Sequence, residues 1–439
     1  MSNQSKISPQ RSADNFPKEN SDEGAVHQKS AIELMAPAGS QAALTAAIDA
    51  GADSVYFGVG KLNMRARSAD FTPDDLSGIA ARCREAGVKS YLALNTIIYD
   101  DEMDEMRALC DSAKAASVSA VIATDIATIV YARSIDLEVH ISVQANVANF
   151  KALEFFSRYA DTVVLARELT LNQISNLWKK IQQHDVRGPS GEPVRLELFG
   201  HGALCVAVSG KCYMSLAQNN HSANRGTCLQ TCRRKYRVTD EETGEELVID
   251  NKHVMSPKDL CTVQYLDKIT AAGISVLKLE GRARTADYVA VTTRVYREAL
   301  DALAAGTYDP ENCESWIDAL SKVFNRGFWH GGYYCGNPLG EWSGNSHSQA
   351  TETRDQIGTV SNFFGKLNVA EFKLIKHAIE PGDQLLVEGP TTGAVRFTAE
   401  NLHVDGKPIE SAVPGNLVTL AVPLKARRQD KVFLLKPGK

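Results

Sequence analysis

Short apolar runs alternate with longer amphipathic stretches from Ile32 onward, and each run is four to six residues long. Runs of this length are typical of buried strands, whereas the stretches between them show the wider apolar spacing of helices. Eight runs occur before residue 280: Ile32–Ala36, Ser54–Phe57, Ser90–Asn95, Ala120–Thr124, Val139–Val143, Thr162–Ala166, Arg195–Phe199 and Ser275–Leu279. Strands that alternate with helices indicate a parallel sheet, and eight of them are enough to close a (β/α)₈ TIM-type barrel.

Several of the predicted helices end at a glycine, as a helix C-cap does, namely at Gly51, Gly87 and Gly273. The clearest helical patterns are Gln41–Ala50, Pro73–Ala86, Asp101–Ala116, Phe150–Tyr159 and Leu171–Gln182. A doubly wound open sheet is the alternative to a barrel. It would need a turn with three glycines after its first strand, but residues 36–40 (APAGS) contain one. The barrel is therefore favoured.

The connection between the seventh and eighth runs is unusually long, with some seventy residues. We place a cysteine-bearing insertion at residues 201–255, within a barrel domain of residues 30–345. Long insertions in compact domains usually carry function. This segment is therefore the first place to look for chemistry.

The two ends of the chain differ in character from the barrel. Residues 1–29 are polar and lack apolar periodicity, so we expect a disordered tail. Residues 350–439 show short β runs separated by turn signals, which predict a small antiparallel β-barrel domain. Its runs are Gly358–Phe363, Leu367–Leu374, Gln384–Val387, Ala394–Thr398, Leu417–Val422 and Val432–Leu435.

The composition is that of a globular protein, with 44% hydrophobic and 23% charged residues. No apolar run reaches the roughly 18 residues of a membrane span, and the first thirty residues contain no hydrophobic signal core. We therefore expect a cytoplasmic protein with no membrane partner. Disulfides are rare in that reducing compartment, so the nine cysteines favour metal ligation or catalysis. A net charge of −5 provides no general attraction for nucleic acid.

Four of the cysteines form the pattern C-x(6)-C-x(15)-C-x(3)-C, at Cys205, Cys212, Cys228 and Cys232. Thiolates are ligands for soft metals, and four of them satisfy either a tetrahedral zinc ion or an iron–sulfur cluster. Structural zinc sites usually contain two short C-x(2–4)-C pairs, and only the last two cysteines form one. The irregular first pair favours a cluster, while zinc remains the alternative.

Polar residues follow the predicted strands at the end where barrel enzymes place their active sites. They are Arg65, Arg67, Asn95, Asp125, Gln144, Asn146, Arg167, Glu168, His201, Cys205, Glu280 and Arg282. Some of them could instead cap helices, and Asp125 is a plausible N-cap for the helix that follows. As a set, charged groups that converge on one concavity are costly unless a ligand or metal uses them.

A basic run lies beside the cysteines: Arg225, Arg233, Arg234, Lys235 and Arg237, with Tyr236 among them. It could contact a phosphate backbone or offset the charge of thiolate ligands, and the residues alone do not choose. The lysines and arginines of the C-terminal segment suit an RNA contact, but an ordinary solvated surface is the simpler interpretation.

Five ordered motifs resemble a known family, the collagenase-like peptidases of peptidase family U32. They are Leu34-Met35-Ala36-Pro37-Ala38-Gly39, Gly51-Ala52-Asp53-Ser54-Val55-Tyr56, Ser142-Val143-Gln144-Ala145-Asn146, His201-Gly202-Ala203-Leu204-Cys205 and Lys278-Leu279-Glu280-Gly281-Arg282. The resemblance extends over residues 32–335, and the β-rich segment resembles the C-terminal domain of the family. Within the family, the order of domains and the Gly-Thr-Cys-x(3)-Cys ending resemble members that hydroxylate tRNA.

The resemblance implies an oxidative RNA modification, in which the wobble uridine of tRNA becomes 5-hydroxyuridine with prephenate as co-substrate. The four cysteines would hold a [4Fe–4S] cluster above the barrel mouth. Arg65, Arg67, Arg167 and Arg282 would then bind the dicarboxylate, because guanidinium groups match carboxylates bidentately. Asn95, Gln144, Asn146 and Lys278 complete the expected substrate-binding set. His201, Glu168 and Glu280 are the candidate proton-transfer groups, with His201 the best placed by its ordinary pKa.

Two other classes of protein remain open. The family name implies a peptidase, although neither an H-E-x-x-H zinc pair nor a G-x-S-x-G elbow occurs in the sequence. A non-catalytic iron–sulfur scaffold or carrier is the other. The partners expected for the RNA-modifying enzyme are tRNA, a small dicarboxylate, and a reductant or iron–sulfur assembly protein.

Overall fold

The structure is a computed structural model, and it describes residues 32–66, 70–234, 239–244, 256–329, 334, 336, 342–343, 347–423 and 425–438. The predicted tail of residues 1–29 lies outside these ranges. So do residues 235–238 and 245–255 of the predicted cysteine insertion. No helix in the described ranges combines the length and the apolar character that crossing a membrane requires.

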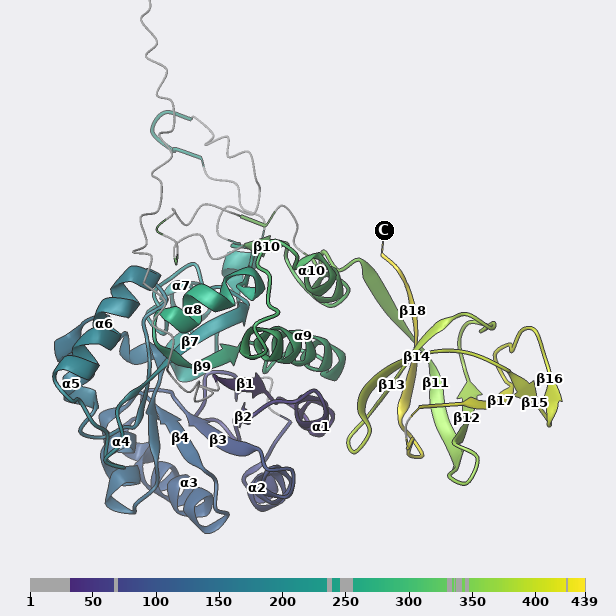
Figure 1. Cartoon of the computed structure of the whole chain (residues 1–439), viewed down its shortest axis with the longest axis horizontal. Helices are drawn as coiled ribbons and strands as arrows, with labels where there is room; N and C mark the ends of the chain where they lie inside the picture. The colour runs from purple at the N-terminus through teal and green to yellow at the C-terminus, as the bar shows by residue number, and fades with distance from the viewer. Residues whose placement is uncertain are drawn as a thin grey trace, which may run out of the picture. The chain divides into compact units, whose positions relative to one another are not determined.

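Eight parallel strands close into a barrel (Figure 1). They are β1 (Glu33–Pro37), β2 (Ser54–Phe57), β3 (Lys89–Leu94), β4 (Ala120–Ala123), β5 (Val139–Ile141), β6 (Thr162–Val164), β7 (Arg195–Gly202) and β9 (Ile274–Leu279). Strands β1 to β7 pair in sequence order, and β9 pairs with both β1 and β7, which completes the ring. The predicted (β/α)₈ barrel is confirmed, and the ends of its predicted strands differ from the observed ends by at most three residues.

The barrel strands are buried on both faces, as their continuous apolar runs indicate. On β1, Leu34 and Ala36 pack into the large core that the strands share with the surrounding helices. Met35, which lies between them, joins Tyr56, Tyr91 and other residues in a separate cluster inside the barrel. This division follows from the alternation of side chains along a strand.

Helices cover the outside of the strands (Figure 1). They are α1 (Gln41–Asp49), α2 (Leu76–Glu85), α3 (Met103–Ala115), α4 (Ile126–Ser134), α5 (Phe150–Phe156), α6 (Leu171–Gln183), α8 (Leu266–Ala271), α9 (Ala286–Ala304) and α10 (Glu314–Ser321). The carboxylate of Asp125 accepts a hydrogen bond of 2.9 Å from the backbone N–H of Ala127, so Asp125 is the predicted N-cap of α4. Gly51, Gly87 and Gly273 have positive φ just after their helices, as C-cap glycines do.

The insertion after β7 contains more structure than its sequence indicated. Its described part holds the short helix α7 (Met214–Asn219) and the 3-10 turns η5 (Ala223–Arg225) and η6 (Thr231–Arg233). Strand β8 (Asp259–Cys261) then pairs antiparallel with the end of β7, and the two-residue strand β10 (Phe328–Trp329) pairs with β8. Further 3-10 turns are η2 (Pro73–Asp75), η3 (Asp100–Glu102), η4 (Val143–Ala145) and η7 (Val263–Tyr265).

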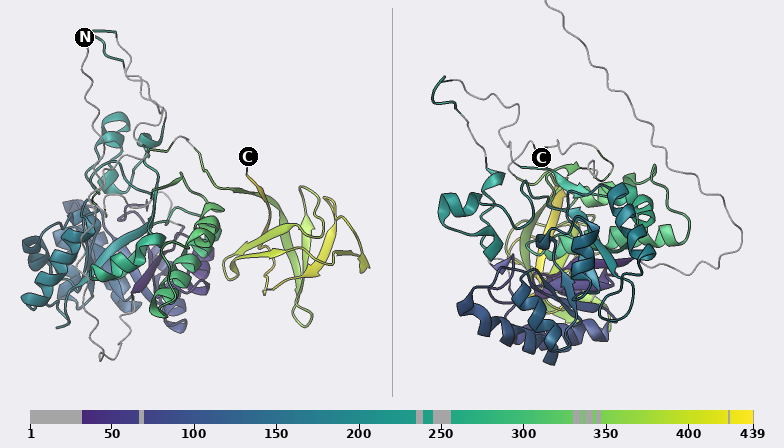
Figure 2. Two further views of the ribbon diagram at one scale, coloured as in Figure 1. Left: turned by 45° about the horizontal axis from the view of Figure 1, so that its top comes forward. Right: turned by 90° about the vertical axis from the view of Figure 1, so that its left-hand side faces the viewer.

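The C-terminal segment forms an antiparallel sheet of its own (Figure 2). Its strands are β11 (Glu352–Phe364), β12 (Val369–Leu374), β13 (Gln384–Gly389), β14 (Gly393–Thr398), β15 (His403–Val404), β16 (Lys407–Pro408), β17 (Leu417–Ala421) and β18 (Lys431–Pro437). They enclose a separate apolar core that includes Phe372, Leu385 and Val418. The predicted antiparallel character is confirmed, and the described pairings give a sheet whose order begins at β14 and ends at β16.

Candidate functional site

A cavity of about 590 Å³ lies at the C-terminal ends of the barrel strands. Five strands reach it with Tyr56 of β2, Ala93 of β3, Ile122 of β4, Phe199 of β7 and Lys278 of β9. Loops after the strands contribute most of the remaining barrel side. The insertion between β7 and β8 forms the opposite wall. Barrel enzymes place their active sites at this end, so the cavity is the candidate site.

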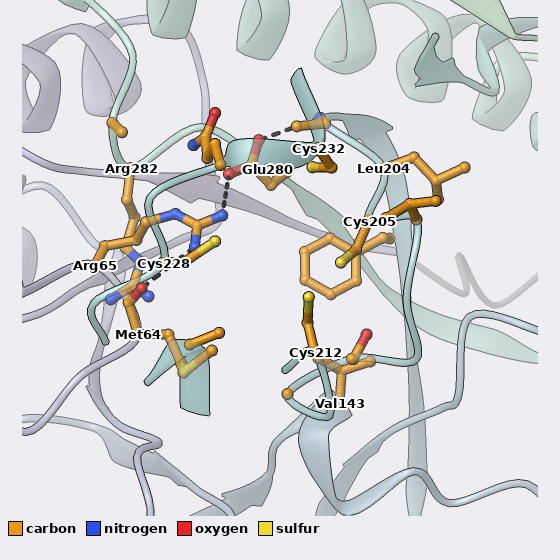
Figure 3. A pocket seen from close by; sticks show the side chains of 18 of the residues that line it. Met64, Arg65, Val143, Leu204, Cys205, Cys212, Cys228, Cys232, Glu280 and Arg282 are labelled. Carbon is orange, nitrogen blue, oxygen red and sulfur yellow. Dashed lines mark hydrogen bonds and ion pairs between the residues drawn. The ribbon is translucent and has the colours of Figure 1, made fainter. Parts of the chain in front are cut away.

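All four clustered cysteines line this one cavity. Cys205 is exposed, and Cys212, Cys228 and Cys232 are partly buried as free thiols. Figure 3 shows their sulfur atoms pointing toward a common space. Burial raises the pKa of Cys232, and the other three thiols raise it further, so the four groups interact electrostatically. The fold therefore brings together residues that span 28 positions of sequence, from 205 to 232.

The thiols surround a space rather than meeting at a point (Figure 3). A zinc ion bound at about 2.3 Å by four thiolates requires sulfur atoms within roughly 4 Å of one another. In the described part of the chain, no group of three or more His, Cys, Asp or Glu side chains has an arrangement that could hold one metal ion. An iron–sulfur cluster does not require that arrangement, because each thiolate binds a different iron. Four free cysteines that line one cavity are a donor set that fits such a cluster.

Positive charge dominates the described lining of the cavity. Six arginines and one lysine line it, against one carboxylate. The cations are Arg65, Arg167, Arg233, Arg282, Arg284, Arg326 and Lys278. Lys278 pairs with Glu197, Arg326 and Arg284 pair with Asp259, and Arg65 pairs with Glu280. In a chain whose net charge is −5, this concentration of cations gives the cavity a local positive charge.

The predicted arginines are held in distinct ways. Both terminal nitrogens of Arg167 donate to the backbone oxygen of Ala203 at 3.2 Å, and its guanidinium lies 4.9 Å from the ring centre of Phe199. Arg282 is buried and donates to the side-chain oxygen of Asn63 at 3.3 Å. Burial lowers the pKa of Arg282 to about 10, which leaves it charged at neutral pH. Arg67 lies outside the described residues.

Glu280 is the single carboxylate of the described lining. It accepts hydrogen bonds from the backbone N–H of Ala203 at 3.1 Å and from Arg65 at 3.4 Å. Burial alone would raise its pKa, but Arg65 and Arg284 outweigh burial, so the pKa of Glu280 is lowered. Its side chain is therefore ionised at neutral pH, and it can accept a proton rather than donate one.

Two of the predicted amides line the cavity and a third supports it. Asn95 and Gln144 line the cavity, where Asn95 accepts a hydrogen bond from the backbone N–H of Met64 at 3.2 Å. Asn146 lies outside the lining and has a left-handed backbone, with a φ of 52°. Its side chain donates to the backbone oxygen of Gln144 at 2.8 Å. It holds the loop after β5 in place, and its role as a substrate contact stays a prediction.

Two of the expected proton-transfer groups are not at the cavity. His201 is 2% exposed and does not line the cavity, and its Nδ1 lies 3.3 Å from the hydroxyl of Tyr296. Burial lowers the pKa of His201 to about 3, so it is neutral. The pairing of β7 with β9 shifts register between Phe199 and His201, and this irregularity accompanies the inward packing of the imidazole. Glu168 is exposed and also lies outside the lining. Of the three expected groups, Glu280 remains.

The wall of the cavity formed by the insertion is fixed to the barrel by Arg225. Its guanidinium lies 4.0 Å from the ring centre of Tyr99, and it bonds to the backbone oxygen of Ile97 and to the carboxylate of Glu102. Gly226 follows with a φ of +80°, and a Cβ there would lie 2.2 Å from the backbone oxygen of Asn63. Only a glycine permits this close contact, two residues before Cys228.

Several cavity residues were not anticipated from the sequence. Arg284, Arg326 and Tyr56 line it, and Glu197 forms a buried ion pair with Lys278 directly beneath it. A sequence pattern could have identified Glu197, because it is a charged residue within the apolar run of β7. A charged residue in a buried strand usually has a charged partner.

Comparisons with known proteins place the chain in a family. The model of peptidase family U32 matches residues 39–344. A collagenase of Porphyromonas gingivalis is 49% identical over 403 residues, which are 92% of this chain and 97% of that protein. The 23S rRNA 5-hydroxycytidine synthase of Escherichia coli is 34% identical over 306 residues, 67% of this chain and 44% of that protein. The tRNA hydroxylation protein P1 of Bacillus subtilis is 30% identical over 392 residues, 87% of this chain and 89% of that protein.

The chain therefore belongs to peptidase family U32, as its motifs indicated. Its relatives include a protein named as a collagenase and proteins named for RNA hydroxylation. By sequence identity the chain is more similar to that collagenase than to the tRNA hydroxylation protein. Family membership by itself does not choose between the two activities, so the choice depends on the chemistry of the cavity.

Proposed function

We propose that the chain is an iron–sulfur enzyme that modifies tRNA, with hydroxylation of the wobble uridine to 5-hydroxyuridine as the reaction and prephenate as co-substrate. The observation that carries the proposal is the cavity itself, where four free thiols share one space with seven cationic side chains. The relatives named for tRNA and rRNA hydroxylation support an RNA substrate.

The charges around the thiols suit a cluster bound by Cys205, Cys212, Cys228 and Cys232. A [4Fe–4S] cluster held by four thiolates is anionic overall, so it needs nearby cations in a partly buried site. Arg65 interacts electrostatically with Cys228, and Arg233 with Cys232 and Cys205. When bound, the cluster would supply electron transfer next to the substrate. Zinc remains the alternative metal.

The arginines provide the site for the small co-substrate. Arg167 and Arg282 are fixed by hydrogen bonds to Ala203 and Asn63, and Arg65 is fixed by Glu280. The Nε of Arg167 is buried without a hydrogen-bond partner, so it has a donor to offer. Guanidinium groups bind carboxylates bidentately, and several of them in one cavity fit a dicarboxylate such as prephenate.

Glu280 is the residue that can move a proton in this reaction. Hydroxylation at C5 of uridine replaces a hydrogen by a hydroxyl group and is a two-electron oxidation, so the base must lose its C5 proton at some step. The ionised carboxylate of Glu280 is held at the cavity wall by Arg65 and Ala203 and can accept that proton. Tyr56 and Phe199 add aromatic surface to the cavity.

Collagen hydrolysis is the second candidate function, and the 49% identity to a protein named as a collagenase favours it. The two candidates make opposite demands on the thiols. The RNA-modifying enzyme needs all four as ligands, whereas a thiol peptidase would need one free thiolate as a nucleophile. Iron content and peptidase activity therefore separate them.

The first experiment is anaerobic purification with iron and sulfide analysis and a visible absorbance spectrum. Wild type is compared with the double variant Cys228→Ala/Cys232→Ala and with Cys83→Ala, which removes a buried thiol of the core outside the cavity. We expect about four irons per chain in wild type and in Cys83→Ala, and loss of iron in the double variant. Zinc, or no metal, in wild type would refute the cluster.

The second experiment measures the product in cells, where the oxidant and reductant are supplied. A strain that lacks the gene is complemented with wild type, Arg282→Ala or Arg187→Ala, the last of which alters an exposed arginine away from the cavity. Mass spectrometry of digested tRNA should find 5-hydroxyuridine with wild type and Arg187→Ala but not with Arg282→Ala, whose iron content should stay normal. Unmodified tRNA with wild type, together with cleavage of denatured collagen by the purified protein, would favour the peptidase.

A further inference from the structure

A chain of titratable side chains crosses the interior of the barrel beneath the cavity. It begins with Lys278, which lines the cavity from β9 and is 4% exposed. The ammonium of Lys278 lies 2.8 Å from Oε1 of Glu197 on β7, whose side chain is fully buried. A buried ion pair of this kind is expensive to form, so its presence at the floor of a cavity calls for a role.

The second oxygen of Glu197 faces an imidazole. Its Oε2 lies 3.6 Å from Nδ1 of His140 on β5, and both atoms are buried without a hydrogen-bond partner. This separation is longer than a hydrogen bond, and a small rotation of either side chain would close it. One carboxylate thus stands between a lysine and a histidine, and each of its oxygens is directed to one of them.

This row of titratable side chains reaches water at the opposite end of the barrel. Nε2 of His140 lies 3.3 Å from Oε1 of Glu138, whose side chain is 45% exposed. Glu138 immediately precedes β5, so it lies at the N-terminal ends of the strands, away from the cavity. The imidazole can therefore exchange its proton with solvent without using the cavity mouth.

The other titratable groups around Lys278, Glu197 and His140 have their own partners. Glu33, at the N-terminal end of the barrel, accepts hydrogen bonds from Tyr91 at 2.7 Å, from Arg195 at 2.8 Å and from Lys89 at 3.2 Å. The ring of Tyr91 also packs against His140, with 4.4 Å between ring centres. On the cavity side, Arg282 and the ring of Tyr56 lie near Lys278. Glu197 therefore remains the carboxylate shared by Lys278 and His140.

We propose that His140 and Glu197 are positioning residues for Lys278, because Lys278 and His140 share the carboxylate of Glu197, which couples the charge on Lys278 to the proton on His140. An anion that draws Lys278 toward the cavity weakens the ion pair between Lys278 and Glu197. His140 then binds one proton from water through Glu138, and it releases that proton when the anion leaves. One proton moves for each binding event, and no electrons move.

The pKa shifts agree with this geometry. Burial alone would lower the pKa of His140, but Glu138 and Glu197 outweigh burial and raise it. Burial lowers the pKa of Lys278, and Glu197 opposes this change. The proton on His140 and the charge on Lys278 therefore compete for the same carboxylate.

The coupling can be measured by NMR without any assumption about iron or RNA. Full-length protein is labelled with ¹³C at the ring carbons of histidine, and the signal of His140 is identified by its loss in His140→Gln. Its titration midpoint is then compared in wild type, in Lys278→Met and in Arg167→Met, which removes a cavity cation that has no contact with Glu197. Thermal unfolding of each variant confirms that it is folded.

We expect Lys278→Met to raise the midpoint of His140 by about one to three pH units, because Glu197 then acts on His140 alone. Arg167→Met should leave it nearly unchanged. An unchanged midpoint in folded Lys278→Met, or an equal shift in both variants, would overturn the proposal. If Lys278→Met does not fold, Glu197→Gln decides the question: the midpoint should fall by a similar amount, and a constant midpoint would exclude Glu197 as the shared group. Either result is independent of the proposed RNA modification.

Discussion

Replacing Arg225 by alanine should release the cysteine-bearing wall of the cavity from the barrel. Arg225 is the last residue of η5 and lies three positions before Cys228. Its side chain packs on Tyr99 and bonds to Ile97 and Glu102, all of which lie near the start of α3. The substitution removes these contacts and leaves Glu102, which is 6% exposed, without its ion-pair partner Arg225.

The size of the effect follows from these contacts. Hydrogen bonds to a charged group contribute about 1.5–3 kcal/mol, and a cation–π contact at a partly exposed site contributes about 0.5–1 kcal/mol. Together they stabilise the docked segment by about 2–4 kcal/mol. This energy should appear as local opening of residues 222–234 and only in small part as global unfolding, because the core of the barrel is unaffected.

Hydrogen exchange measured by mass spectrometry tests this expectation. Amides of the segment 222–234 should exchange about 30 to 1,000 times faster in Arg225→Ala, since each 1.4 kcal/mol corresponds to a factor of ten. The matched control is Arg187→Ala, which removes an arginine from an exposed ion pair with Asp185 and should change exchange by less than a factor of about three. Unchanged exchange in 222–234 would refute the view that Arg225 fixes this wall.

Two further predictions concern pH and backbone conformation. Burial would raise the pKa of Glu33, but Arg195, Lys89 and Tyr91 outweigh burial and lower it to about 2 from 4.5. Glu33 therefore contributes up to about 3 kcal/mol of stability above pH 4.5, and this contribution is lost as the pH falls toward 2. Urea denaturation should show this loss in wild type and a weaker pH dependence in Glu33→Gln; equal slopes would contradict it. Gly226→Ala should lower the iron content of purified protein, because its Cβ would meet the Asn63 backbone, whereas Gly244→Ala, which also has positive φ but no neighbour within 4 Å, should retain iron. Equal iron content in both variants would show that the contact at 226 is unimportant.

The sequence by itself determined the architecture, because that depends on patterns that repeat along the chain. Alternating apolar runs and helical stretches predicted the eight strands of the barrel, and a change of period predicted the C-terminal sheet. The N-cap at Asp125 and the C-cap glycines were also readable, since capping depends on residues a few positions apart. Strand β8 was not predicted, because its three residues carry too short a pattern within the long insertion.

The cysteine spacing indicated a metal-binding group, and the long insertion indicated where it would lie. The convergence of the four thiols on one cavity with Lys278 and the arginines depends on the closure of the barrel. No local sequence pattern predicts that closure, because it pairs β9 with β1, which lie at opposite ends of the barrel sequence.

Burial and charge state were decided by the tertiary structure alone. His201 and Glu280 were both expected to transfer protons at strand ends, with His201 the better placed, yet the fold makes His201 a neutral core residue and Glu280 an ionised cavity residue. The pairing of Glu197 with Lys278 and His140 was equally hidden, because it brings together three strands that are far apart in sequence. A local pattern indicates which face of a strand a residue occupies, but its pKa depends on the neighbours that the closed barrel places around it.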